Sequence, residues 1–277
     1  MSRVTARRAM TRIAPGVRIS RPDTLAVEEP LELRLDGRSL MVTMRTPGSD
    51  IDLAHGLLFG EGLIDTAEDI VSARYCSGTD AEGRNTYNVL DIRLRRPVAI
   101  PERSFLATGA CGLCGKTAIE EVRTRRRFTL DAERPTVDAA LLAGLPERLR
   151  AGQKVFDATG GLHAAGLFTA DGTALVVAED IGRHNAVDKV VGWALRHDLL
   201  PARDLLLVVS SRASFELVQK AVVAGIGFLA AVSAPSSLAV DLAADADLTL
   251  VGFLRGDTMN VYSGAHRLTA LPATAPA

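Results

Sequence analysis

The sequence predicts an α/β fold made of two parts, and three observations support this prediction. The composition is that of a folded chain, with 277 residues of which 47% are hydrophobic and 23% charged, and such values exclude a disordered chain or a fibrous repeat. The first half alternates apolar and polar residues, as a half-buried sheet does. From Gly160 onward, short helical stretches alternate with continuous apolar strands, which is typical of a sheet covered on both faces.

The beginning of the chain is rich in arginine. Residues 1–22 contain six arginines and no acidic residue. The Arg7-Arg8 pair is a feature of some export signals, and the lack of acids is a feature of transit peptides. No apolar segment follows, however, because Ala9 to Ser20 is interrupted by Thr, Arg, Pro and Gly. We therefore expect residues 1–22 to be a disordered basic arm.

Residues 23–135 are predicted to form a smaller, β-rich α+β domain. Leu31, Leu33 and Leu35 alternate with polar residues, and Asp36-Gly37 is a strong hairpin signal. Further elements are expected as a returning strand at 40–44, a helix from residue 49 or 50 through 63, strands at 70–75 and 87–95, and a loop with two cysteines.

Residues 136–277 are predicted to form the larger α/β domain. Pro135-Thr136 is a helix-opening signal for residues 137–151. The elements that follow are expected as strands at 163–168 and 174–177, a helix at 185–196, a strand at 205–209, a helix at 216–224, a strand at 228–232, a helix at 238–244 and a strand at 248–253.

Charge and cysteine content exclude several classes of function. Lys plus Arg is 32 against 33 for Asp plus Glu, a formal net charge of −1, which argues against a nucleic-acid-binding face. Residues 221–240 carry no charge, but Gly225, Gly227 and Pro235 interrupt them, so we expect no membrane span. Three cysteines are too few for a secreted disulfide framework. We therefore expect a cytoplasmic protein.

The sharpest local motif is the pair Cys111 and Cys114, separated by Gly and Leu. Two such thiols can hold zinc, form a redox pair or transfer sulfur. Zinc requires two more ligands, and the sequence offers only the isolated Cys76 and a histidine, His163, that could supply a third. We predict no metal. A thioredoxin-like helix start is disfavoured by the neighbouring glycines. These glycines favour a mobile loop, and Lys116 favours the thiolate that attacks sulfur.

Polar residues also gather where predicted strands meet helices, which is where open α/β sheets bind ligands. In the segment 179–189, one interpretation is a plain helix start, with Asp180 as cap and Asn185, Asp188 and Lys189 facing solvent. The other is a pocket for a large phosphorylated ligand. Its candidate residues are His163, Arg183, His184, Asn185, Ser210, Arg212, Phe253, Leu254, Arg255, Gly256, Asp257 and Thr258. The phosphate-loop and dinucleotide-fold glycine motifs are absent from the sequence.

These motifs together resemble the formate dehydrogenase accessory sulfurtransferase family, FdhD. The resemblance runs from Glu28 to Tyr262. It rests on EEPL at 28–31, MRTPG at 44–48, GEG at 60–62, CGLCG at 111–115, TGGLHAA at 159–165, EDIGRHNAVDK at 179–189, SFELVQK at 214–220, APSSLA at 234–239 and NVY at 260–262. The segment 179–189 is the longest and most specific of them.

The resemblance implies a cytidine-deaminase-like, three-layer α/β/α fold for the larger domain. It also implies a sulfur carrier that takes sulfane sulfur from a cysteine desulfurase and passes it to the molybdenum cofactor. The family's ligand is bis(molybdopterin guanine dinucleotide), which formate dehydrogenase receives. Cys111 matches the persulfide-bearing cysteine, Cys114 its partner, and residues 253–258 the cofactor-binding stretch. We also expect a homodimer.

Two departures and two alternatives accompany this resemblance. The family usually has Ser-Gly-Arg where this chain has Ser210-Ser211-Arg212, and Asp257 is an unexpected acid beside a polyanionic ligand. One alternative function is a non-catalytic chaperone that binds the cofactor and the formate dehydrogenase. The other is a zinc-dependent deaminase, but the sequence lacks the ordered motifs which that chemistry uses.

Overall fold

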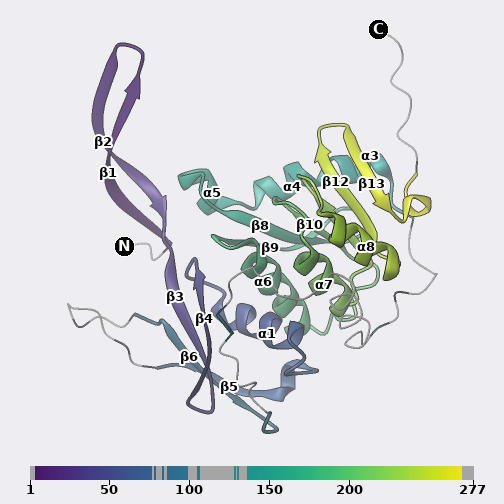
Figure 1. Ribbon diagram of the computed structural model, residues 1–277, viewed down its shortest axis with the longest axis horizontal. Coiled ribbons are helices and arrows are strands. Elements are labelled where there is room, and N and C mark those ends of the chain that lie inside the picture. Colours follow the sequence, from purple (N-terminus) through teal and green to yellow (C-terminus); the bar gives the residue numbers. More distant parts are fainter. Residues whose placement is uncertain are drawn as a thin grey trace.

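The computed structural model describes residues 4–76, 78, 83, 86–98, 105–106, 128, 130 and 136–269 (Figure 1). It contains a six-stranded sheet, a five-stranded sheet and a separate two-stranded sheet, together with helices. The predicted mixed α/β class is therefore confirmed. The likeness to cytidine deaminases stays a prediction. No helix in the described ranges is both long and apolar enough to cross a membrane.

The five-stranded sheet is built from the first half of the chain. Its strands are β3 (Glu29–Leu35), β4 (Arg38–Arg45), β5 (Ile70–Tyr75), β6 (Val89–Leu94) and β7 (Phe105–Leu106), in the order β5-β6-β3-β4-β7. Leu31, Leu33 and Leu35 are buried on one face, as the alternation predicts. Asp36 and Gly37 both have positive φ, which confirms the turn between β3 and β4.

The six-stranded sheet has the order β13-β12-β11-β10-β8-β9, in which β10, β11 and β12 are parallel. Its strands are β8 (His163–Phe168), β9 (Ala174–Asp180), β10 (Leu206–Val209), β11 (Phe228–Ala231), β12 (Thr249–Arg255) and β13 (Thr258–Ser263). The helices are α3 (Ala139–Ala143), α4 (Leu145–Ala151), α5 (Lys154–Thr159), α6 (Arg183–Arg196), α7 (Phe215–Val223) and α8 (Ser237–Asp245).

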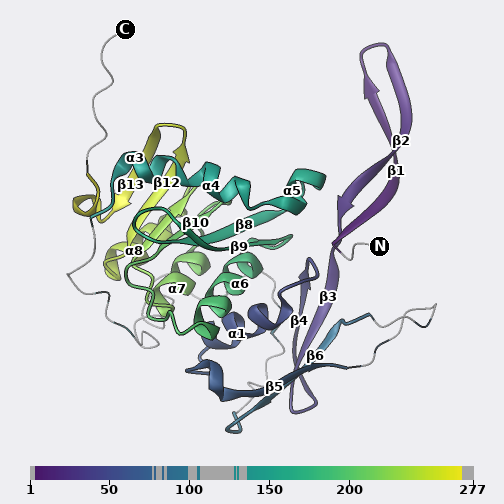
Figure 2. The same cartoon turned by 180° about the vertical axis from the view of Figure 1, so that it is seen from behind.

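Helices cover both faces of this sheet, as Figures 1 and 2 show. Strand β10 illustrates why: Leu207 and Val209 join the core on the side of α6, α7 and α8, whereas Leu206 and Val208 join a second core on the side of α3 and α4. Because successive side chains of a strand point to opposite faces, one continuous apolar run contributes to the cores on both sides of the sheet.

The two halves of the chain meet where α1 (Asp50–Gly60) crosses α6. Two glycines permit the close approach. A Cβ atom on Gly56 would lie 1.9 Å from the Asp188 carbonyl oxygen, and one on Gly192 would lie 1.8 Å from the Asp52 carbonyl oxygen. Any other residue at either position would force the helices apart. The same apolar core contains Leu31 from the first half and Leu250 from the second.

Several sequence predictions need correction. Residues 5–26, expected within a disordered arm and the strand after it, form a hairpin of β1 (Thr5–Ala14) and β2 (Val17–Ala26). The single helix expected at 137–151 is two helices that meet at Gly144, because Pro146 cannot donate the backbone hydrogen bond that would continue α3. Helix α5 and strand β13 were not predicted. The boundary at residues 135–136 stays a prediction, since 131–135 lie outside the described residues.

Candidate functional site

Most of the candidate ligand residues lie along one edge of the six-stranded sheet. The edge is formed by the C-terminal ends of β9, β10, β11 and β12 and by the N-terminus of β8, where His163 pairs with Asp180. Ligands of open α/β sheets bind at such strand ends. Cys111, Cys114 and Lys116 lie outside the described residues, so the cysteine pair stays a prediction.

His163, Arg183 and His184 form a cationic corner at this edge. Burial, and then the positive charges of Arg183 and His184, lower the pKa of His163. The Nε atom of Arg183 is buried and has no hydrogen-bond partner among the described residues. Such an unpaired buried donor is costly unless a ligand satisfies it. The corner is therefore suited to an anionic group.

His184 is held by the first turn of α7. Its Nε2 atom lies 3.4 Å from Ser214 Oγ and 3.7 Å from Glu216 Oε2. The hydrogen bond from His184 lowers the pKa of Glu216 to about 2. Glu216 is therefore ionised at neutral pH, and its carboxylate and the Ser214 hydroxyl fix the position of the His184 ring at the edge.

The loop after β10 is tied to β8. Ser210 Oγ accepts a hydrogen bond from the Ala164 N–H at 2.9 Å, and the Ser210 N–H donates to the Ala164 carbonyl at 3.0 Å. Ser210 thus has a structural role as well as a place at the edge. Arg212 is exposed. The next residue, Ala213, is tied to the loop after β11, because its N–H donates to the Ala234 carbonyl at 3.2 Å.

Residues 253–258 form the end of β12 and its turn into β13. Phe253 has φ +52° and is 41% exposed, which is an unusual conformation for a bulky residue. Arg255 is exposed, and its Nε donates to the Val232 carbonyl at 3.0 Å. Leu254, in contrast, is fully buried in the apolar core. The structure therefore brings Phe253 and Arg255 to the edge and turns Leu254 away from it.

The polar residues Asp180, Asn185, Asp188 and Lys189 of the segment 179–189 are buried, which corrects the interpretation of a solvent-facing helix start. Asp180, Asn185 and Lys189 are at most 7% exposed, and the helix is capped by Gly182 rather than by Asp180. Lys189 Nζ lies 2.7 Å from Asp180 Oδ2 and donates to the Thr46 carbonyl at 3.0 Å. The amide of Asn185 donates to the Met44 carbonyl at 2.8 Å and to Asp180. Asn185 thus lies in an internal network that fixes the position of α6.

This buried network joins α6 to β4 and continues into the first half of the chain. Arg45 is fully buried and forms a two-armed ion pair with Asp50, both contacts at 3.1 Å. Asp188, the remaining residue expected to face solvent, is also buried and pairs with Lys220 at 2.6 Å. Burial raises the pKa of Asp188, while Lys220 opposes this shift. Sequence reasoning missed Arg45, although its MRTPG motif marked the position.

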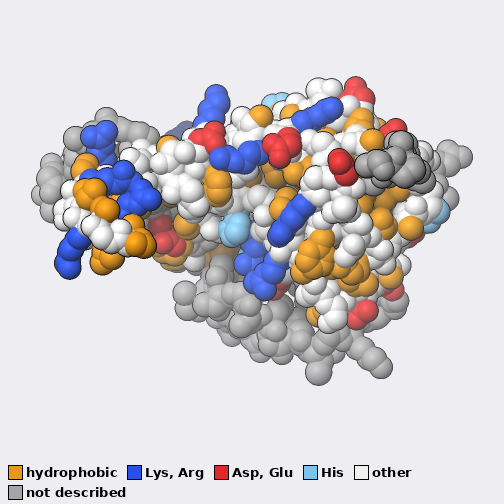
Figure 3. All heavy atoms as spheres, turned by 90° about the horizontal axis from the view of Figure 1, so that it is seen from above, with side chains coloured by type: hydrophobic (Ala, Val, Ile, Leu, Met, Phe, Trp, Pro, Cys, Tyr) orange, Lys and Arg blue, Asp and Glu red, His pale blue; other side chains and the backbone are white. Residues whose placement is uncertain are grey.

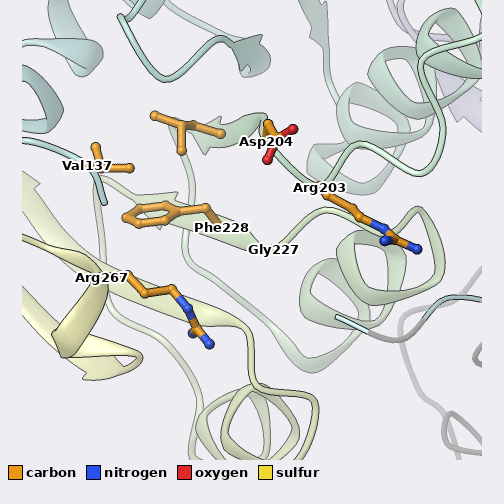
Figure 4. A pocket seen from close by; sticks show the side chains of 7 residues that line it. Val137, Arg203, Asp204, Gly227, Phe228 and Arg267 are labelled. Atoms are coloured by element: carbon orange, nitrogen blue, oxygen red, sulfur yellow. The ribbon is translucent and has the colours of Figure 1, made fainter. Parts of the chain in front are cut away.

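A pocket at the opposite edge of the sheet contains none of the candidate residues. It is lined by Val137, Arg203, Asp204, Leu206, Gly227, Phe228 and Arg267 (Figure 4). Arg267 is engaged in an ion pair with Asp247 and also donates to the Thr249 hydroxyl. The guanidinium of Arg267 is therefore already paired with a carboxylate, whereas Arg203 is exposed at the pocket.

The fold and the edge define a class of protein: an α/β protein with a cationic ligand edge and, in its sequence, a cysteine pair between the two halves. The chain belongs to the FdhD/NarQ family, whose model matches residues 26–269. It is 70% identical over 271 residues to the sulfur carrier protein FdhD of Nocardia farcinica, covering 98% of this chain and 97% of the relative. It is 52% identical to the sulfur carrier protein FdhD of Mycobacterium tuberculosis, covering 97% of this chain and 100% of the relative.

A solved structure shares the fold. It is a crystal structure of a proposed formate dehydrogenase accessory protein from Desulfotalea psychrophila, with a TM-score of 0.73, 24% identity and coverage of 96% of this chain and 100% of that one. The predicted family is thus confirmed. The sulfur-carrier function predicted from the sequence is also confirmed, because it is the function that the names of the relatives print.

Proposed function

We propose that this chain takes sulfane sulfur from a cysteine desulfurase as a persulfide on Cys111. In this step the Cys111 thiolate attacks the outer sulfur of the desulfurase persulfide, and the desulfurase thiolate leaves. Cys114 assists as the second thiol of the pair. The family and the names of the relatives support sulfur transfer, and the motif supports these two residues.

The acceptor in this proposal is the molybdenum cofactor in its bis(molybdopterin guanine dinucleotide) form, bound at the strand-end edge as substrate. Its phosphates would lie near the cationic corner and near Arg212 and Arg255, since such groups form charge-assisted hydrogen bonds with phosphate oxygens. The exposed ring of Phe253 offers a face on which a nucleobase can stack. The sulfurated cofactor then passes to formate dehydrogenase.

The single observation that carries the ligand assignment is the buried Arg183 Nε without a partner in the described part of the chain. Arg183 lies at the edge where α/β sheets bind ligands, and its charge acts on His163 there. Asp257 is exposed on the turn and is compatible with an anionic ligand only if it points away from the phosphates.

The test of the sulfur step is mass spectrometry of the intact protein after incubation with a cysteine desulfurase and cysteine. The expected result is a gain of one sulfur that maps to the peptide with Cys111 and is lost in Cys111→Ala. Cys76→Ala is the matched control and should retain the added sulfur. A sulfur that remains in Cys111→Ala and maps to Cys76 contradicts the proposal.

The same variant separates a sulfur carrier from a non-catalytic chaperone. In reconstitution, Cys111→Ala should bind the cofactor as the unchanged protein does, yet yield formate dehydrogenase without formate-oxidising activity. A chaperone that only binds the cofactor would still produce active enzyme with this variant. Active formate dehydrogenase from Cys111→Ala would therefore rule out the carrier mechanism.

A further inference from the structure

The hairpin of β1 and β2 is a sheet of only two strands. Its register is unbroken from the pair Thr5–Ala26 to the pair Ala14–Val17, and Gly16 with φ +70° closes the turn. Figures 1 and 2 show it extending away from the two larger sheets. A two-stranded ribbon has little core of its own and is marginally stable in water. A folded ribbon of this length is therefore a natural docking element.

The register sorts its side chains onto two faces, because residues directly opposite each other share a face. One face, here called the arginine–aliphatic face, contains Ala6, Arg8, Met10, Arg12, Ala14, Val17, Ile19, Arg21, Asp23 and Leu25. Val17, Ile19 and Leu25 on this face are 44%, 52% and 43% exposed. On β1 the apolar side chains of this face alternate with Arg8 and Arg12, whereas on β2 Val17 and Ile19 are followed by Arg21, Asp23 and Leu25.

The charge of the ribbon identifies the chemistry of its partner. Residues 5–26 carry five arginines against one aspartate, whereas the whole chain has a formal net charge of −1, so the remainder is acidic. None of the ribbon arginines forms an ion pair within the described part of the chain. An acidic partner would therefore supply the missing counter-charges.

The partner that fits best is another protein. Arginine next to exposed aliphatic groups is the composition of protein interfaces, whereas a phosphate backbone would leave Val17, Ile19 and Leu25 uncovered. The body of a second copy is also acidic overall, so the light-scattering measurement below distinguishes self-association from binding to a different protein. The chemistry of the face fits an acidic, partly apolar protein surface, and the position of the ribbon favours the protein that receives the ligand.

The base of the ribbon is connected to the ligand edge. Helix α5 packs against β2, and its Val155 and Phe156 N–H groups donate to the Glu179 carboxylate at 2.9 and 2.7 Å. Glu179 directly precedes Asp180 of the buried network. Figure 3 shows basic side chains on the ribbon and on the body on the same face of the molecule. A partner on the ribbon would thus lie beside the edge from which the ligand is delivered.

We propose that the arginine–aliphatic face docks on an acidic, partly apolar surface of the enzyme that receives the ligand. The delivery of the ligand and the identity of that enzyme, formate dehydrogenase, rest on the function proposed above, whereas the docking face rests on the register, exposure and charge of the ribbon. The ribbon holds the two proteins together while the ligand moves from the cationic edge to its recipient.

The test measures binding of the full-length chain to the cofactor-free formate dehydrogenase of the same organism by biolayer interferometry at two salt concentrations. Arg8→Glu with Arg12→Glu reverses two charges on the docking face. The matched control, Arg7→Glu with Arg18→Glu, reverses two charges on the other face. The first variant should raise Kd at least about tenfold and reduce its salt dependence, and the control should change Kd by less than about threefold. Ile19→Ser should weaken binding more than Ile13→Ser, its match on the other face.

Equal effects of the two charge reversals, or no binding by the unchanged chain, would overturn the proposal. It would also be overturned if Arg8→Glu with Arg12→Glu abolished self-association in light scattering, or binding to a fluorescent DNA duplex, with no effect on the enzyme. Persulfide formation on Cys111 and binding of GDP, which represents the guanine nucleotide part of the proposed cofactor, are measured on the same variants and should not change. If the unchanged chain neither forms the persulfide nor binds GDP, the proposed function is wrong. The docking proposal is then decided separately, by whether charge reversal on the docking face weakens enzyme binding more than charge reversal on the other face.

Discussion

Two faces of helix α6 carry polar residues with opposite roles. Asn185 and Lys189 face inward, where they are buried and paired with β4 and β9. Arg183 and His184 lie at the strand-end edge, where one has a buried donor without a described partner and the other faces Glu216. A single motif thus has a structural half, which fixes the position of the helix, and a half that is available to a ligand. The predictions below test this division.

The largest effect is expected on the inward face. Lys189→Ala would leave the Asp180 carboxylate buried without its cation, and breaking such a buried pair costs about 3–5 kcal/mol of unfolding free energy. Arg196→Ala, on the same helix, removes an exposed ion pair with Asp52 and should cost at most about 1 kcal/mol. Urea denaturation compares them. The combination of Lys189→Met with Asp180→Asn should recover part of the loss.

A small effect of Lys189→Ala, similar to that of Arg196→Ala, would show that the network does not hold the two halves together. Binding of GDP by folded Lys189→Ala is the second measurement. Lys189 affects the ligand edge only by fixing the position of α6. Lys189→Ala should therefore weaken GDP binding less than Arg183→Ala does.

The next effect is expected at the edge. Arg183→Ala and Arg255→Ala should each weaken GDP binding by about 1.5–3 kcal/mol, because each would remove a charge-assisted hydrogen bond to phosphate. Arg203→Ala, an exposed arginine in the pocket at the opposite sheet edge, is the control and should leave affinity unchanged. Isothermal titration calorimetry measures all three. If Arg203→Ala weakens GDP binding and Arg183→Ala does not, GDP binds at the opposite edge of the sheet and the proposed ligand edge is wrong.

The division within α6 also marks what sequence could and could not predict. Strands β3, β8 and β10 follow from alternation or from apolar runs bounded by turn signals, and the shared edge of the candidate residues follows from their places at strand ends. The burial of Lys189 does not follow, because its partners Thr46 and Asp180 come from other elements and only tertiary pairing makes a buried lysine tolerable. The sequence pattern alone placed it on the solvent side of the helix.

The β1–β2 ribbon and the crossing of α1 and α6 were not predicted from the sequence, for related reasons. The arginines of β1 and β2 mask a period-two pattern, and a two-stranded sheet needs no continuous apolar face, so composition indicated disorder. Gly56 and Gly192 gave no signal of their own, because their role depends on a helix that is remote in the sequence. Local patterns therefore identified elements, and contacts between remote elements decided the roles of their residues.

A third effect concerns proton uptake at the edge. Burial and neighbouring cations lower the pKa of His163, so it stays neutral at pH values where a free histidine would be protonated. A bound phosphate would raise this pKa. GDP binding should then take up protons, and affinity should increase as pH falls through the range near and below a free histidine's pKa. Calorimetry in buffers of different ionisation enthalpy measures the uptake. His163→Gln should remove most of it, and the same uptake in that variant would place the titrating group elsewhere.

The smallest effect concerns the pair of His184 and Glu216. The folded-state pKa of Glu216 is lowered to about 2 from an ordinary 4.5, so its contribution to stability is present above about pH 4.5 and is lost as pH falls toward 2. Glu216 is partly exposed, which limits this contribution to about 1 kcal/mol or less. Glu216→Gln should therefore flatten the loss of stability between these pH values, as measured by urea denaturation at several pH values. His184→Gln should flatten it to a similar extent, because the histidine is the main cause of the shift. If His184→Gln leaves the acid profile of the unchanged chain intact, Glu216 is held by the backbone of α7 rather than by His184, and the outward half of the motif consists of Arg183 alone.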